Sequence, residues 1–168
     1  MSVTISGSTG ITLPDNGSLS TSVAGAMVID SAGRVTTPLQ PAFGATRSAG
    51  NVNENTYYVF NDAAYNIGGH YSTSTGKFTA PVAGRYQINV NLMSADTATL
   101  DNKHWQLVVN ATTIQRVYSS NGSAVHHRWN WNGILSLAAN DYVEVYSNDL
   151  RLYGSDGAYG HFSGYLLG

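Results

Sequence analysis

Apolar and polar residues alternate with a period of two along much of this chain, and that pattern most constrains its fold. Between residues 85 and 92 every second side chain is apolar, and the apolar set is Tyr86, Ile88, Val90 and Leu92. A β-strand directs successive side chains to opposite faces, so this stretch is predicted to have one buried and one polar face. Similar patterns recur at residues 105–109, 129–137, 143–145 and 162–166, separated by segments rich in Gly and Asn. No window has a sustained helical period, so we predict an all-β domain, either a sandwich or a jelly roll.

Low charge is the most unusual property of the composition. Charged residues make up 11% of the 168 residues and the formal net charge is -2, whereas soluble domains carry roughly 25% charged residues. Uncharged polar groups must therefore cover the surface, while 11 Tyr, 4 Phe and 3 Trp provide a core and an apolar interface. The 8 Lys and Arg residues are scattered, which argues against nucleic acid as a partner. No polybasic or amphipathic segment predicts insertion into a membrane.

Cysteine is absent, which excludes disulfides and thiolate metal ligands. Residues 1–7 lack the basic start and apolar run of a secretion signal, and no apolar stretch is long enough to span a bilayer. These features predict a protein made in a reducing cytoplasm that reaches the exterior by cell lysis or by a dedicated route.

The chain is predicted to consist of an arm, residues 1–41, and a head, residues 42–168. The arm has short β-prone pieces at 3–5 and 11–13, a turn signal at 14–17 and a hairpin pattern centred on 31–33. It holds few large apolar residues and cannot bury enough surface alone to offset its chain entropy. We therefore expect its order to come from wrapping other copies or from binding a partner.

Six residues in the head fall at a characteristic spacing. They are Phe60, Asn66, Tyr71, Phe78, Gly84 and Tyr86, and the chain ends on a second marker at residues 162–167. The pattern resembles the globular head of complement C1q, a jelly roll that tumour necrosis factor shares in outline. Ile88 and Val90 depart from it, because the family prefers aromatic residues at those two positions, and Asn140 stands where Gly is common.

The resemblance implies a homotrimer in which one sheet of each copy supplies side chains to a threefold interface. We expect the face of Tyr86, Ile88, Val90 and Leu92 to form that interface. The full set assigned to trimer interface or core is Phe60, Tyr71, Phe78, Tyr86, Ile88, Val90, Leu92, Phe162 and Leu166. Burying one Tyr or Phe there contributes ~1.5–3 kcal/mol, so a few residues per copy suffice.

The arm carries a second resemblance. Residues 10–17 and 29–43 resemble junctions in bacteriophage fibre and other virion proteins, and the arm lacks collagen Gly-X-Y repeats. This favours a phage virion structural protein on the virion surface: a trimeric short fibre, spike or capsid decoration protein. Under this hypothesis residues 1–41 anchor the trimer to a capsid or tail protein, and the head projects and binds the host surface.

Few residues form a pattern typical of a chemical site. His126 and His127 are adjacent, so on a strand they point to opposite faces and cannot share a metal within one chain, although one His per copy could meet at a threefold axis. The C1q resemblance allows calcium near the head, yet Asp101, Asp149 and Asp156 form no spaced ligand loop. No nucleophile, phosphate-loop or paired-carboxylate motif occurs, so we predict no enzyme activity and no required cofactor. A hydrolase acting on surface glycans is the least favoured alternative.

Loops at the end of the head opposite the arm are the expected place for recognition. The resemblance places segments 48–55, 94–102, 119–123 and 148–159 there. The candidate ligand residues are Asn53, Asp101, Asn121, Asp149, Arg151, Tyr153, Asp156 and Tyr159. Such groups stack on sugars and hydrogen-bond to them, but they also occur in loops that bind nothing. A soluble trimeric lectin or adhesin that binds surface glycans is therefore the alternative to the virion hypothesis.

Overall fold

The structure, a computed structural model, describes residues 28–29, 32–95, 102–118, 126–154 and 157–168. Contacts divide the chain into two compact units, Met1–Gln40 and Pro41–Gly168. In the first unit β1 (Val28–Ile29) and β2 (Val35–Thr36) pair antiparallel, which confirms the predicted hairpin. Gly33 has a φ of 79°, a left-handed conformation that glycine adopts without steric cost. The pieces expected at 3–5, 11–13 and 14–17 lie outside the described residues.

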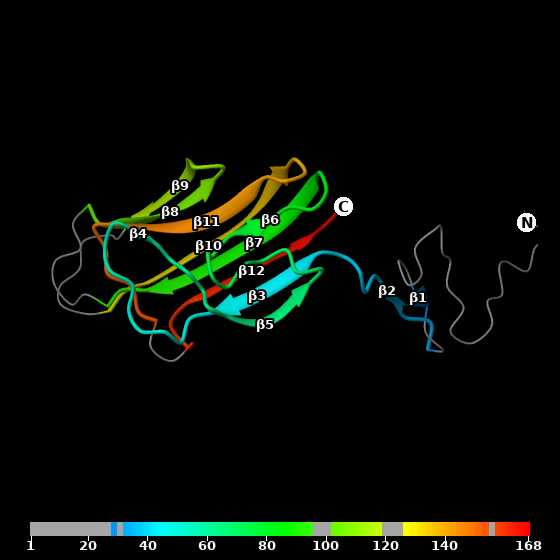
Figure 1. Ribbon diagram of the computed structural model, residues 1–168, viewed down its shortest axis with the longest axis horizontal. Coiled ribbons are helices and arrows are strands. Elements are labelled where there is room, and N and C mark those ends of the chain that lie inside the picture. Colours follow the sequence, from blue (N-terminus) through cyan, green and yellow to red (C-terminus); the bar gives the residue numbers. More distant parts are fainter. Residues whose placement is uncertain (1–27, 30–31, 96–101, 119–125, 155–156) are drawn as a thin grey trace, which may run out of the picture. The chain divides into compact units, whose positions relative to one another are not determined.

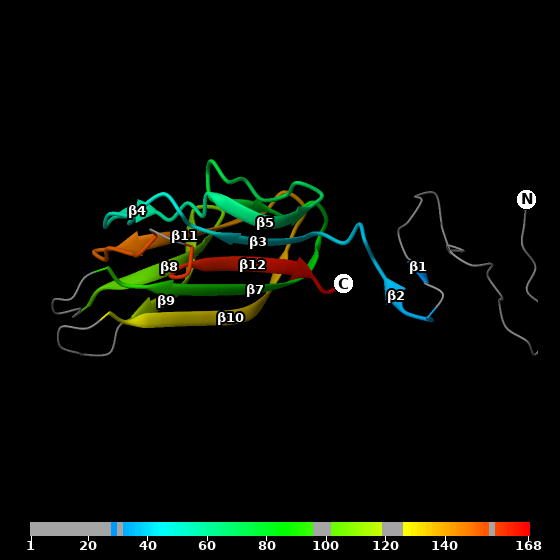
Figure 2. The same ribbon diagram turned by 90° about the horizontal axis from the view of Figure 1, so that it is seen from below.

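The second unit is a sandwich of two antiparallel sheets, visible as two layers in Figure 1. The sheet here called the β7 sheet has the order β10-β7-β12-β3-β5, and Figure 2 shows these five strands side by side. Its members are β3 (Ala42–Thr46), β5 (Asp62–Ile67), β7 (Gly84–Met93), β10 (Arg128–Leu137) and β12 (His161–Leu166).

The second sheet, here called the β11 sheet, has the order β4-β11-β8-β9, and β6 also pairs with β11. Its members are β4 (Thr56–Tyr57), β6 (Phe78–Thr79), β8 (His104–Val109), β9 (Thr112–Tyr118) and β11 (Tyr142–Asn148). The described part of the chain contains no helix, and hence none that could cross a membrane. The all-β class predicted from the alternation and the jelly-roll sandwich implied by the resemblance are both confirmed.

Aromatic rings fill the space between the two sheets. Phe43 stacks on Tyr71 and Phe78, with ring centroids 5.0 and 4.6 Å away, and meets the ring of Phe162 edge-on at 4.8 Å. Tyr71 donates its hydroxyl to the carbonyl of Phe60 at 2.9 Å, which satisfies a polar group that burial would otherwise leave unpaired. Burial also raises the pKa of the Tyr71 hydroxyl well above its ordinary value, so it stays protonated.

The expected threefold interface through the alternating apolar face requires a correction. Tyr86, Ile88, Val90 and Leu92 are all buried inside the sandwich of a single chain. They face the β11 sheet and have no surface left to present to a second copy. The other residues assigned to interface or core also belong to the core of one chain. Four of them are buried in it, namely Phe60, Tyr71, Phe78 and Phe162, and Leu166 packs against it.

Asn66, one of the six spaced residues, has a role in the backbone rather than in the core. Its side-chain amide donates to the carbonyl of Tyr71 at 2.8 Å, and its amide oxygen accepts from the Tyr71 N–H at 3.1 Å. The side chain thus closes the turn after β5 in the way a strand partner would, and it places Tyr71 over the core. Gly84 is needed for packing, because an added Cβ would lie 2.6 Å from Cδ1 of Leu166.

Candidate functional site

The open face of the β7 sheet, defined as the side turned away from the core, carries side chains in rows across the strands. From β10 to β5 the rows are Ile134, Gln87, Tyr165, Ala42 and Ile67; then Asn132, Asn89, Ser163, Gly44 and Tyr65; then Asn130, Asn91, His161, Thr46 and Asp62. These rows hold one carboxylate, that of Asp62 on the edge strand, and no Lys or Arg. The middle of the open face is therefore uncharged when His161 is neutral.

Large apolar side chains are exposed on the open face. Ile134 is 59% and Tyr165 46% exposed, and Tyr65 and Ile67 are also exposed. Gly44 lets Tyr65 lie across β3, because a Cβ on this glycine would come within 2.7 Å of the tyrosine Cζ. Apolar side chains gathered on one face and bordered by polar groups are typical of a protein interface.

Amide and hydroxyl side chains fill the other rows of the open face and bond to one another. The Asn91 amide donates to the Asn130 amide oxygen, and the Asn89 amide donates to the Ser163 hydroxyl at 3.4 Å. His161 lies in the same rows on the central strand β12, and partial burial lowers the pKa of its imidazole.

The distal end, defined as the end of the sandwich away from Pro41 and Gly168, brings separate loops together. Val52 and Ser94 both form bridges to Leu152, so segments 48–55, 94–95 and 148–154 meet there. Asn55 and Asp149 both have positive φ and are joined by two hydrogen bonds, from the Asn55 amide to the carboxylate at 2.8 Å and from the Asp149 N–H to the Asn55 amide oxygen at 3.1 Å. The Asn148 amide donates to the other carboxylate oxygen at 3.0 Å.

An aromatic cluster lies beside these loops. The ring of Tyr153 is 4.9 Å from that of His126 and 4.8 Å from that of Tyr159, and the Arg128 guanidinium lies 6.0 Å from the Tyr159 ring centre. His126 Nδ1 donates to the Ser94 carbonyl at 3.0 Å, so its Nε2 accepts a long hydrogen bond of 3.5 Å from the Tyr153 hydroxyl. This distal cluster of His126, Arg128, Tyr153 and Tyr159 can stack on a flat ligand and hydrogen-bond to it.

The candidate ligand residues fall into four groups. Tyr153 and Tyr159 meet in the distal cluster. The Asp149 carboxylate accepts hydrogen bonds from Asn55 and Asn148. Asn53 and Arg151 are exposed, each two residues along the chain from one member of the Asn55–Asp149 pair. Asp101, Asn121 and Asp156 lie outside the described residues. Sequence reasoning missed Arg128 and the pairing of His126 with Tyr153, because 27 residues separate that pair and only the tertiary fold joins them.

The geometry limits what this end can bind. Among the described residues no three His, Asp or Glu side chains gather closely enough to hold a metal ion. The Asp149 carboxylate already accepts two amide hydrogen bonds. His126 is exposed. His127 is partly buried, and its backbone N–H donates to the Ser94 hydroxyl at 2.9 Å. The distal end is thus suited to stacking and hydrogen bonding, and the calcium hypothesis stays a prediction.

Comparison with known proteins assigns the head to one family. The C1q domain matches residues 42–167. Complement C1q tumor necrosis factor-related protein 3 of Mus musculus and of Homo sapiens is 28% identical over 129 residues, which is 77% of this chain and 52% of those proteins. Caprin-2 of Danio rerio is 28% identical over 134 residues, or 14% of its length. The chain thus spans about half the length of the first relatives or less.

Solved structures agree on the fold. The globular domain of zebrafish complement 1qA protein superposes with a TM-score of 0.60 at 21% identity, over 77% of this chain and 98% of that domain. Eiger TNF from S. frugiperda gives a TM-score of 0.56 at 16% identity, over 77% of this chain and 93% of that one. These identities support a shared fold and carry no information on ligands.

Proposed function

Because the chain belongs to the C1q domain family, whose domains form homotrimers, we propose that it works as a homotrimeric binding head. The observation that carries this proposal is the open face of the β7 sheet. It is uncharged across its middle and exposes Ile134, Tyr165, Tyr65 and Ile67, although the core of the same chain is already complete. Three copies joined through this face would cover apolar surface that a monomer leaves in water.

Native mass measurement tests the trimer and its pH dependence. We expect a mass three times the 17.9 kDa of one chain at about pH 7.5, and dissociation toward about pH 5. The pKa of His161 is already lowered by partial burial in the single chain, and joining copies through the open face would bury its imidazole further, so we expect the assembled state to favour neutral imidazole. Neutral His161 therefore leaves the stability of the assembly intact above the ordinary imidazole pKa of about 6.5. That stability is lost as the pH falls from about 6.5 toward the lowered pKa of His161.

His161→Gln provides the matched control, because Gln keeps a polar side chain and cannot gain a proton. The neighbours of His161 on the adjacent strands are Asn91 and Thr46, and the charged groups close by are Asp62 in the same row and Arg128, which donates to Asn91 at 3.4 Å. We expect the trimer of the His161→Gln variant to persist at about pH 5. Equal dissociation of both proteins would assign the acid sensitivity to another group.

We further propose that the distal end is a ligand-binding end and that the head binds rather than catalyses. Tyr153, Tyr159 and Arg128 offer stacking surfaces, and surface glycans are the ligand class that fits them. Three weak sites on one trimer gain avidity without any new contact. A glycan screen with the intact trimer tests this, since binding that survives Tyr153→Ala and Tyr159→Ala would exclude the distal cluster.

A virion role is the second proposal, and it is supported by the sequence of residues 1–41 alone. The C1q domain match begins at residue 42, and the relatives named above are complement C1q-related proteins and Caprin-2, not phage proteins. Deletion of residues 1–41 is expected to leave a folded trimer that no longer joins virus particles, measured by co-sedimentation with purified particles. Truncated trimers that still load onto particles would contradict an anchoring arm.

A further inference from the structure

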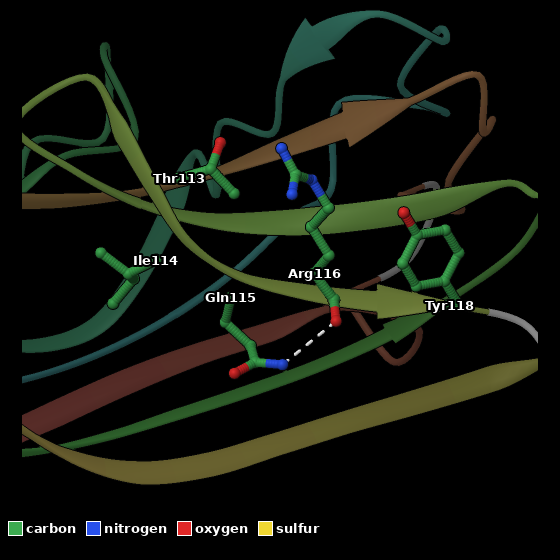
Figure 3. Close-up of a pocket in the computed structure, with 5 residues that line it drawn as sticks. All are labelled: Thr113, Ile114, Gln115, Arg116 and Tyr118. Atoms are coloured by element: carbon green, nitrogen blue, oxygen red, sulfur yellow. Dashed lines mark hydrogen bonds between the residues drawn. The ribbon is translucent and has the colours of Figure 1, made fainter.

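Side chains of β9, the last strand of the β11 sheet, line a hollow. Its volume is about 280 Å³ and its lining residues are Thr113, Ile114, Gln115, Arg116 and Tyr118 (Figure 3). One edge of β9 pairs with β8, and among the described residues no strand pairs with the other. This β9 hollow belongs to neither the open face nor the distal cluster. Its volume lies close to the lower end of the range for small-molecule sites, which is roughly 300 Å³.

The side chains of the β9 hollow combine an aromatic ring with polar groups. Thr113, Arg116 and Tyr118 project from one side of β9, and Gln115 projects from the other (Figure 3). The Tyr118 ring is 53% exposed and Ile114 is 44% exposed. Gln115 donates its amide to the Arg116 carbonyl at 3.1 Å. The hollow therefore has a ring, a guanidinium and a hydroxyl on one side of the strand and a carboxamide on the other.

A hydrogen-bonded network behind the hollow holds Tyr118 and Thr113 in place. The His104 ring lies 4.4 Å from the Tyr118 ring, and its Nδ1 donates to the Asn102 carbonyl at 3.1 Å. Its Nε2 must then accept from the Gln106 amide at 3.0 Å, while the Thr113 hydroxyl donates to the Gln106 amide oxygen. His104 is buried, so it gives Tyr118 and Thr113 a fixed support, whereas the exposed Arg116 side chain would be ordered when a ligand binds.

Arg116 gives the hollow its charge. Its guanidinium is exposed and has no ion-pair partner in the ranges of the chain that the structure describes. Glu144, a carboxylate on the same sheet, pairs with Lys77 at 3.7 Å instead. A guanidinium of this kind matches the two oxygens of a ligand carboxylate, and such charge-assisted bonds are about twice as strong as neutral ones.

We propose that the β9 hollow binds an acidic sugar. In this arrangement Arg116 takes the sugar carboxylate, the Tyr118 ring stacks on the apolar face of the pyranose, and Thr113 and Gln115 bond to its hydroxyls. The proposal rests on the proposed function only in that the head binds glycans, and it places a site on the side of the head instead of at its distal end.

An extended peptide that adds a strand to β9 is the competing occupant, and the strand geometry disfavours it. The register shifts between Leu107 and Val108, so Leu107 pairs with Gln115, Val108 pairs with Thr113, and Ile114 is an extra residue. A bulge interrupts the regular ladder of N–H and C=O groups that an added strand requires. The hollow also has the size of one sugar ring rather than of a strand.

Calorimetric titration of the whole chain tests the site with two matched probes, tetragalacturonate and the neutral tetramer of galactose. We expect the acidic tetramer to bind at least about 10-fold more tightly. Arg116→Gln is expected to remove that preference, Tyr118→Ala to weaken the acidic tetramer about 10-fold, and Tyr118→Phe to preserve its binding. Arg85→Gln is the control, since Arg85 is exposed on β7, a strand of the other sheet, so the change removes the same charge outside both proposed ligand sites and should leave this binding unchanged. Arg128→Gln reports separately on the distal cluster.

Three outcomes would overturn the acidic-sugar site: equal affinity for both tetramers, unchanged binding by Arg116→Gln, or equally tight binding of tetra-aspartate. Loss of binding in Arg128→Gln alone would move the ligand to the distal cluster, which overturns the β9 site and upholds the proposed function. Circular dichroism of each variant separates the loss of a ligand contact from the loss of folding. Because every replaced side chain is exposed, we expect each variant to fold.

Discussion

Replacing Ile134 and Tyr165 together with Asp is expected to convert the trimer into a folded monomer. Both residues lie in one row of the open face, on either side of Gln87. In a trimer joined through this face, burial of each side chain contributes about 1.5–3 kcal/mol, and the change removes that contribution from every copy. It also places six carboxylates in the interface, where each unpaired charge costs several kcal/mol more.

Sedimentation velocity measures this change directly, and circular dichroism shows whether the monomer keeps its strands. Ile114→Asp is the matched control, because Ile114 is also exposed but lies on β9, away from the open face. The control should stay trimeric. If the double variant also stays trimeric, the open face is not the interface.

Phe43→Ala is expected to lower the free energy of unfolding by about 3–5 kcal/mol, the usual cost of truncating a buried Phe. Phe43 is fully buried and contacts the rings of Tyr71, Phe78 and Phe162 within 5.0 Å, so its removal leaves a cavity at the centre of the aromatic core. Typical domains have only about 5–15 kcal/mol in total, so the variant loses a large share of its stability.

Urea denaturation at one fixed protein concentration measures this loss, because the apparent stability of an oligomer depends on concentration. Tyr57→Ala is the matched control: its ring is exposed on the β11 sheet and pairs edge-on with Tyr146 at 5.1 Å, so we expect a loss of about 1 kcal/mol or less. A variant at Phe43 that unfolds no more easily than the one at Tyr57 would show that the core repacks around the cavity.

The core and the fold class could be predicted from sequence because both depend on local regularities. Alternation with a period of two assigns Tyr86 and Ile88 to one face of a strand whatever the strand pairs with. The spacing of Phe60, Tyr71 and Phe78 placed three aromatic residues that the structure buries together. The β1–β2 hairpin could be predicted for the same reason, since the two β-prone pieces and the turn between them lie within about ten residues of one another.

The sites depended on information that no local pattern contains. Alternation shows that a strand has two faces, but not which partner covers each face. The apolar face of β7 is covered by the second sheet of the same chain, so the face left for other copies is the one that holds Asn89, Asn91 and the exposed side chains of neighbouring strands. The apolar contribution to that face comes from three different strands, through Ile134, Tyr165, Tyr65 and Ile67.

The sequence by itself therefore determined the all-β class and the apolar face of the alternating strands, but not whether that face is covered by the same chain or by other copies. The tertiary structure alone decided the open face, the distal pairing of His126 with Tyr153, and the hollow beside Tyr118 and its His104 support. The reason is physical: side-chain direction follows from backbone geometry one residue at a time, whereas a surface is assembled from strands far apart in the chain, and their order and register arise only when the sheets pack.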